Sequence, residues 1–136
     1  MSQAEFDISL SLIIRTKESF ECISNIMGFE PTKKIGLQPK TIESIDVDEN
    51  IWVYKERYEN CIDIGLVIQK FTNGIKDFAN KVFFIKEYGT CVIRLSIVSI
   101  YGQFGFSLSE KDLFLLSNLQ IPLEMTFFSY GSCIDE

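Results

Sequence analysis

The chain has 136 residues, 46% hydrophobic and 24% charged, which excludes a disordered or fibrous protein and indicates one globular domain. Its net charge of −6 makes nucleic acid and anionic membranes poor partners and a basic protein surface a good one. The sequence has no histidine, which is the commonest general base and metal ligand. Its four cysteines form no CxxC pair, and we expect them to be free thiols in a cytoplasmic protein.

The first predicted elements are a strand and a helix. Apolar residues occupy every second position of Phe6–Ile14, which predicts a half-buried strand. Thr16 is a candidate cap for a helix over Lys17–Met27. Gly28 stands where the end of a helix favours a left-handed residue.

A long segment without periodicity follows, from Lys33 to Asn50. Its second half carries four acidic residues and no basic one: Glu43, Asp46, Asp48 and Glu49. Loops of this length are uncommon in compact domains and are often functional. The segment is predicted to be a flexible, solvated acidic loop over about residues 33–50, and a partner-binding role is the alternative.

The central part of the chain predicts a strand and then a helical region. Ile51–Tyr58 alternates as a strand does, and Asn60 or Asp63 could cap the helices that follow. Gly74 is expected to divide the helical region into two. Seven apolar residues in steps of three and four give it one apolar stripe: Ile64, Ile68, Phe71, Ile75, Phe78, Val82 and Ile85.

The C-terminal third predicts a strand, a helix and a last strand. Cys91–Tyr101 is the longest alternating run. Ser109 with Asp112 resembles a capping box that opens a helix through Leu119, and Leu123–Tyr130 is the last strand before a frayed tail at 132–136. The core side of this helix is predicted to be Leu113, Leu116 and Leu119.

These elements predict a single α+β domain over residues 1–136. We expect a four- or five-stranded, mostly antiparallel sheet with its helices packed on one face, near the ferredoxin-like class. No catalytic constellation is evident, since a serine or cysteine nucleophile would lack a histidine base. We therefore expect a protein that is not an enzyme and uses no cofactor or metal.

Two segments resemble a bacterial domain family that has no assigned function. Ile26–Thr32 (IMGFEPT), followed by Gly36 and Trp52, is similar to the "GxEPT…G…W" start of that family. Phe104–Ser109 (FGFSLS), the helix after it and Leu123–Tyr130 are similar to its end. The chain departs from the pattern by lacking a Trp in the central helices and by its acidic insertion at 43–49.

The resemblance implies a binding function, because small members of the family resemble immunity proteins of contact-dependent growth inhibition and related toxin systems. The expected partner is a cognate toxin domain with a basic surface, such as a nuclease. The alternative is a small-ligand-binding or regulatory sensing domain with a pocket between sheet and helices. The expected partner-binding residues combine the acidic stretch with exposed aromatic residues: Glu43, Asp46, Asp48, Glu49, Trp52 and Phe104.

Overall fold

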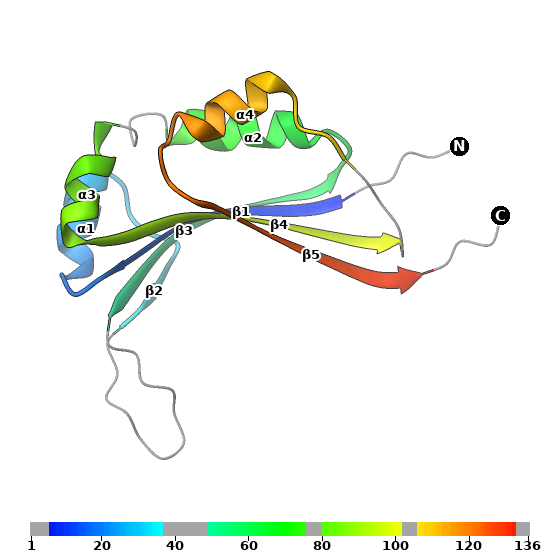
Figure 1. The fold of residues 1–136 in the computed structure, drawn as a ribbon. Coiled ribbons are helices and arrows are strands. Elements are labelled where there is room, and N and C mark those ends of the chain that lie inside the picture. Colours follow the sequence, from blue (N-terminus) through cyan, green and yellow to red (C-terminus); the bar gives the residue numbers. More distant parts are fainter. Residues whose placement is uncertain (1–5, 37–48, 76–79, 102–105, 133–136) are drawn as a thin grey trace, which may run out of the picture.

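The computed structural model of the chain describes residues 6–36, 49–75, 80–101 and 106–132. These residues form one five-stranded sheet and four helices, with the helices against one face of the sheet (Figure 1). The predicted α+β architecture is confirmed.

The sheet is built around its first strand. β1 (Phe6–Thr16) lies between β3 (Asn50–Cys61) and β4 (Gly89–Tyr101) and is antiparallel to both. β2 (Lys33–Ile35) extends one side antiparallel to β3, and β5 (Leu123–Ser132) extends the other side parallel to β4. The strand order is therefore β2-β3-β1-β4-β5.

The helices form two pairs over the sheet. α2 (Ile64–Gly74) and α4 (Glu110–Ser117) lie side by side over its middle (Figure 1). α1 (Phe20–Met27) and α3 (Val82–Tyr88) lie together where β1 ends and β4 begins. The ammonium of Lys81, just before α3, donates to the carbonyl oxygen at the end of α1 over 2.6 Å and ties this second pair together.

Local sequence signals set the helix ends, with one correction. Gly28 ends α1 with φ of 84°, as predicted. The N-cap of α1, however, is Ser19, whose side chain accepts from the backbone N–H of Cys22. Thr16 was the predicted cap, but it belongs to β1 and its hydroxyl donates to the carbonyl oxygen of Tyr88 at 2.6 Å. Thr16 therefore joins the first strand to the end of α3.

The central helical region is broken as predicted. Asp63 caps α2 by accepting from the N–H of Leu66, whereas Asn60 lies in β3 with a positive φ of 54°. α2 ends at Gly74, and α3 starts only at Val82. Phe78, which belongs to the predicted apolar stripe, lies outside the described residues.

The hydrophobic core lies between the helices and one face of the sheet. Most of the predicted stripe is buried there, with Phe71 1% exposed and Ile68 and Ile85 fully buried. The sheet meets this stripe with alternate residues of β1 and β4: Ile8, Leu10, Leu12, Ile14, Cys91, Ile93, Leu95 and Ile97.

Two further predictions are corrected by the fold. Residues 33–35, assigned to the acidic loop, form β2, which is held by pairing with β3 and by the Thr32 N–H donating to the Val53 carbonyl over 2.7 Å. Leu113, predicted to lie in the core, is 50% exposed, and Asp112 is buried instead. The buried side of α4 is thus rotated toward Asp112, Leu116 and Leu119.

Candidate functional site

The face of the sheet opposite the helices, called the open face below, is covered by no element among the described residues (Figure 1). It is formed by the other set of alternate strand residues. Ile13 illustrates the division, since it is only 6% exposed yet does not belong to the core cluster between sheet and helices. Ile13 pairs with Val53 on one side and with Val92 on the other.

The strand register arranges the open face in rows. Ser11 pairs with Lys55 on one side and with Arg94 on the other, and Arg94 pairs with Glu124. Two residues further along, a second row runs Arg57, Ser9, Ser96, Thr126. A third row, on the other side of the first, runs Lys33, Val53, Ile13, Val92. Paired residues share a face, so cations, hydroxyls and aliphatic groups lie side by side.

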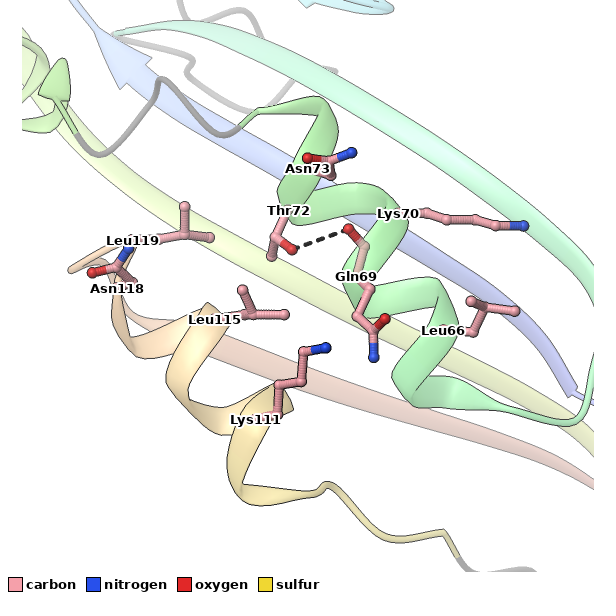
Figure 2. Close-up of a pocket in the computed structure, with 9 residues that line it drawn as sticks. All are labelled: Leu66, Gln69, Lys70, Thr72, Asn73, Lys111, Leu115, Asn118 and Leu119. Carbon is pink, nitrogen blue, oxygen red and sulfur yellow. Dashed lines mark hydrogen bonds between the residues drawn. The ribbon is translucent and has the colours of Figure 1, made fainter.

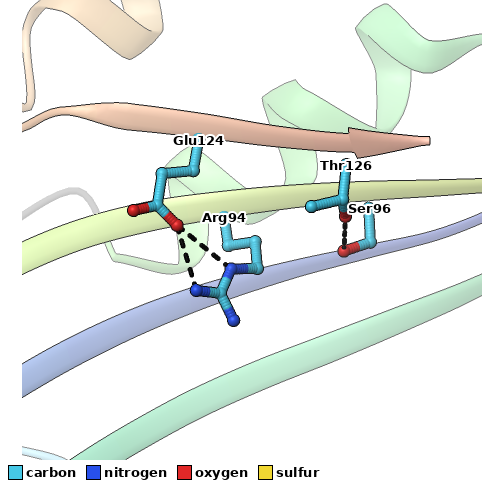
Figure 3. Close-up of polar contacts among 4 residues, drawn as sticks. All are labelled: Arg94, Ser96, Glu124 and Thr126. Carbon is cyan, nitrogen blue, oxygen red and sulfur yellow. Dashed lines mark hydrogen bonds and ion pairs between the residues drawn. The ribbon is translucent and has the colours of Figure 1, made fainter.

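The open face concentrates positive charge in an acidic chain. Lys55 and Arg57 have no ion-pair or side-chain hydrogen-bond partner among the residues that the structure describes. The Arg94 guanidinium contacts the Glu124 carboxylate with Nε and Nη2, at 3.2 and 3.0 Å (Figure 3). Both partners of this ion pair are about half exposed, so it contributes little to stability. Arg15 and Lys33 are exposed on the same face.

Hydroxyl groups separate these cations. The hydroxyls of Ser96 and Thr126 are 2.7 Å apart and join β4 to β5 (Figure 3). Ser11, between Lys55 and Arg94, is only 7% exposed. Ammonium and guanidinium groups next to hydroxyl donors are suited to bind carboxylates. We call the three cations and the four hydroxyl residues together the cation–hydroxyl patch. It consists of Lys55, Arg57, Arg94, Ser9, Ser11, Ser96 and Thr126.

One acidic residue, Asp7, lies at one end of the open face. The register between β1 and β3 shifts between Phe6 and Ile8, where β3 carries a bulge. There the carboxylate of Asp7 accepts from the backbone N–H of Asn60 at 3.1 Å. The charge of Asp7 is thus held at the bulge, one row beyond Arg57.

A groove between α2 and α4 is the second candidate site. It encloses about 450 Å³, within the range of ligand pockets, and is lined mainly by polar residues and leucines. Figure 2 shows Lys111 extending from α4 toward α2, whereas Lys70 and Asn73 point away from α4. The Thr72 hydroxyl is already used within α2, by the carbonyl oxygens of Ile68 at 2.8 Å and Gln69 at 3.2 Å.

A third polar cluster lies on β3, on the helix side of the sheet. The hydroxyls of Tyr54 and Tyr58 both donate to the carboxylate of Glu56, the first at 2.5 Å. The hydrogen bond to Glu56 raises the pKa of Tyr54 to about 12. Burial, and then the hydrogen bond to Glu56, raises the pKa of Tyr58. Both phenols are half-buried and keep their protons, and Tyr54 also packs against Phe71.

Metal and thiol chemistry find little support in the described part of the chain. It holds no group of three or more Cys, Asp or Glu residues placed to bind a metal ion. Cys22, Cys61 and Cys91 are free thiols, while Cys133 lies outside the described residues. Burial raises the pKa of Cys91 to about 12, so this thiol stays protonated. In the same residues no helix is long and apolar enough to cross a membrane.

None of the sequence-predicted partner-binding residues that the structure describes belongs to these sites. Glu43, Asp46, Asp48 and Phe104 lie outside the described residues, and Glu49 is half-buried just before β3. Trp52 is fully buried, and its indole N–H donates to the Ser24 hydroxyl at 3.1 Å. The expectation that Trp52 contacts a partner is therefore wrong, because this residue anchors α1 to the sheet.

Sequence reasoning missed the cation–hydroxyl patch. Its residues come from strands that were predicted, and the positions of Lys55 and Arg57 on one face of the alternating run Ile51–Tyr58 were a usable signal. The register that places both of them across from Ser9 and Ser11 was not available from the alternation alone.

Comparison with known proteins identifies no relative. No protein-family model matches the chain, and neither the curated proteins nor the solved structures contain a match.

Proposed function

We propose that this is a non-enzymatic binding protein that holds a partner protein on the open face of its sheet. The observation that carries the proposal is the pair of cations Lys55 and Arg57, which lie beside hydroxyls on the open face and have no side-chain partner among the residues that the structure describes. Neutralisation of a toxin domain is the specific form of this function that the sequence resemblance implies.

The chemistry of the open face defines the contact that it favours. The cation–hydroxyl patch suits carboxylates, and the half-buried Val53 and Val92 in the adjoining row suit aliphatic side chains. The net charge of −6 of the whole chain repels a polyanion such as nucleic acid. A short acidic segment of a protein interacts mainly with the cation–hydroxyl patch. The partner that this face favours is thus a protein whose contact segment combines acidic and aliphatic residues, in place of the basic surface that the net charge led us to expect.

An NMR titration tests this surface with a peptide of alternating glutamate and valine. We expect shift changes on β1, β3 and β4, and at least tenfold weaker binding by the double variant Lys55→Glu/Arg57→Glu. The matched control is Lys70→Glu/Lys111→Glu, which makes the same charge change on α2 and α4, on the helix side of the sheet, and should bind as the wild type does. Equal loss of binding in both variants would contradict the proposal, because it would reflect net charge alone.

A growth assay tests the narrower form of the function. The chain is co-expressed with a toxin domain encoded beside its gene, and protection from that toxin is scored for the same two double variants. Protection by the control variant and loss of protection by Lys55→Glu/Arg57→Glu would support toxin neutralisation through the open face. Failure of the wild type to protect would contradict the toxin role and leave the titration to decide on peptide binding.

The groove between α2 and α4 supports a second candidate, the binding of a small ligand. Its volume of about 450 Å³ is large enough for one, and Lys111 offers a single cation for an acidic group. The titration separates the two candidates, because peptide binding in the groove would shift resonances of α2 and α4 and would be weakened in the control variant.

A further inference from the structure

The two edges of the sheet are protected very differently. β2 pairs only with Ile51–Val53, so the rest of β3 forms one edge. That stretch carries Glu56, Arg57 and Glu59 and ends in the bulge at Asn60. Charges and bulges are the usual means by which proteins keep an edge strand from pairing with another chain.

The edge formed by β5 carries little such protection among the described residues. β5 has ten residues with Glu124 as its one charged residue, and no described strand pairs with its outer side. Large apolar side chains are exposed on both of its faces. Met125 and Phe127, on the helix side, are 39% and 50% exposed, and Phe128, on the open face, is 61% exposed.

α4 extends this apolar edge. The groove-lining residues Lys111, Leu115 and Asn118 face α2, so Leu113 lies on the opposite side of α4, away from the groove. Leu113 is 50% exposed. The ring of Phe106 contacts the ring of Phe127 at this edge, with 5.8 Å between the two centroids. We call Leu113, Met125, Phe127 and Phe128 the β5-edge patch.

We propose that β5 pairs antiparallel with β5 of a second copy of this chain, about a two-fold axis, so that two five-stranded sheets become one continuous sheet. Antiparallel pairing of a strand with its own copy satisfies the outer backbone N–H and C=O groups of both protomers at once. It also places each β5-edge patch against its equivalent in the other copy.

The sequence of β5 is compatible with pairing to itself. In a register centred on Phe127, Glu124 stands opposite position 130 of the other copy, and therefore no like charges meet. The exposed parts of the four side chains of the β5-edge patch amount to roughly 400 Å² per copy. Because they lie on both faces of the sheet, pairing covers only a share of this area, and the interface stays below the ~800 Å² per partner of a standard interface, as expected of a weak dimer.

This inference is independent of the proposed binding function, since the β5 edge lies across the sheet from Lys55 and Arg57. It nevertheless has a consequence for that function. The open faces of both copies would lie on the same side of one continuous sheet, so the dimer would present two equivalent patches to a partner.

Sedimentation equilibrium of the full chain and hydrogen exchange, both over the micromolar concentration range, test the proposal. We expect a monomer–dimer equilibrium and slower exchange of the β5 amides as the concentration rises. A wild-type protein that stays monomeric throughout would overturn the proposal. So would a dimer whose β5 amides exchange as fast as those of the monomer, because its interface would lie elsewhere.

A pair of matched variants tests the residues. Met125→Lys/Phe128→Lys places charges on the edge, and we expect its dimerisation to be at least tenfold weaker than that of the wild type. The control Ile62→Lys/Leu66→Lys changes two apolar residues of similar exposure, 59% and 49%, next to the other edge, and should dimerise normally. Circular dichroism verifies that both variants fold. Normal dimerisation of a folded edge variant would also overturn the proposal.

Discussion

At the scale of single residues, the Tyr54–Glu56–Tyr58 cluster is the most informative feature. Glu56 is a carboxylate on the helix side of the sheet, where an unpaired charge would be costly. Two phenol donors satisfy it, and they do so only while both keep their protons. The cluster therefore couples the stability of the fold to the protonation of tyrosine.

We predict that alkaline pH destabilises the protein through this cluster. The unfolded chain releases the Tyr54 proton near the ordinary pKa of 10.0, whereas the folded chain holds it until about 12. Above pH 10 the folded state thus binds more protons than the unfolded state, and the free energy of unfolding falls as the pH rises toward 12. Urea unfolding at a series of pH values measures the slope.

The control compares phenylalanine substitutions. In Tyr54→Phe/Tyr58→Phe the fall in stability over this pH range should be smaller, because neither side chain can titrate. Tyr88→Phe, which alters a tyrosine 40% exposed in α3, should retain the wild-type slope. Identical slopes in all three proteins would mean that other groups control the alkaline transition.

At the scale of elements, one close contact fixes how α2 and α4 pack. A Cβ placed on Gly65, in the first turn of α2, would lie 2.7 Å from Oδ2 of Asp112. That carboxylate is 4% exposed and completes the capping box of α4 by accepting from the Ser109 N–H at 3.1 Å. Its position is therefore not free to adjust to a larger neighbour.

We predict that Gly65→Ala destabilises the protein by about 1–3 kcal/mol, the usual cost of overpacking. Gly74→Ala, at the other end of the same helix, has no atom within 4 Å of the added Cβ. It should be neutral or stabilising by about 0.5 kcal/mol, because alanine restricts the unfolded chain. Thermal unfolding of both variants measures the difference, and equal midpoints would show that α2 and α4 can shift apart at little cost.

The elements that were predicted correctly are those whose signals are local. The alternation of apolar residues predicted β1 and β4, and Gly28 predicted the end of α1. The Ser109–Asp112 capping box predicted the start of α4. β2 could not be predicted, since Lys33–Ile35 has no pattern and exists through pairing with β3. The burial of Asp112 in place of Leu113 depends on α2 and likewise has no local signal.

At the scale of the whole molecule, one core joins both helix pairs to the sheet. Phe71 is 1% exposed in this core and packs against Tyr54. Tyr54 also contacts Phe29, and Phe29 contacts Trp52. This chain of aromatic contacts connects α2 with the region of α1. The two ends of the molecule should therefore unfold together.

We predict that Phe71→Ala lowers the free energy of unfolding by about 3–5 kcal/mol. Urea unfolding followed by fluorescence of Trp52, the single tryptophan, and by far-UV circular dichroism should show one coincident transition that moves to lower urea in the variant. Leu66→Ala, at a residue 49% exposed on the same helix, should cost less than about 1 kcal/mol. Separate transitions for the two probes would contradict the single core.

The candidate site also belongs to this scale, which is why the sequence did not predict it. Lys55 and Arg94 are 39 residues apart in the chain and become neighbours of Ser11 only through the register of three strands. The acidic stretch at 43–49 was conspicuous because it is contiguous. A run of like residues in the sequence can reveal a loop of one chemical character. The surface of a sheet, in contrast, is formed by residues from strands that are distant in the sequence.

Among the described residues, cations outnumber acids on the open face, where Arg15, Lys33, Lys55, Arg57 and Arg94 accompany Asp7 and Glu124. The helix layer instead mixes acids such as Glu21, Glu87 and Glu110 with cations such as Lys70, Lys86 and Lys111. In the field of a charged surface such a molecule orients before it makes contact. The protein should therefore be retained on a cation-exchange resin, with its open face toward the resin. This is the opposite of what its pI near 4.7 alone predicts.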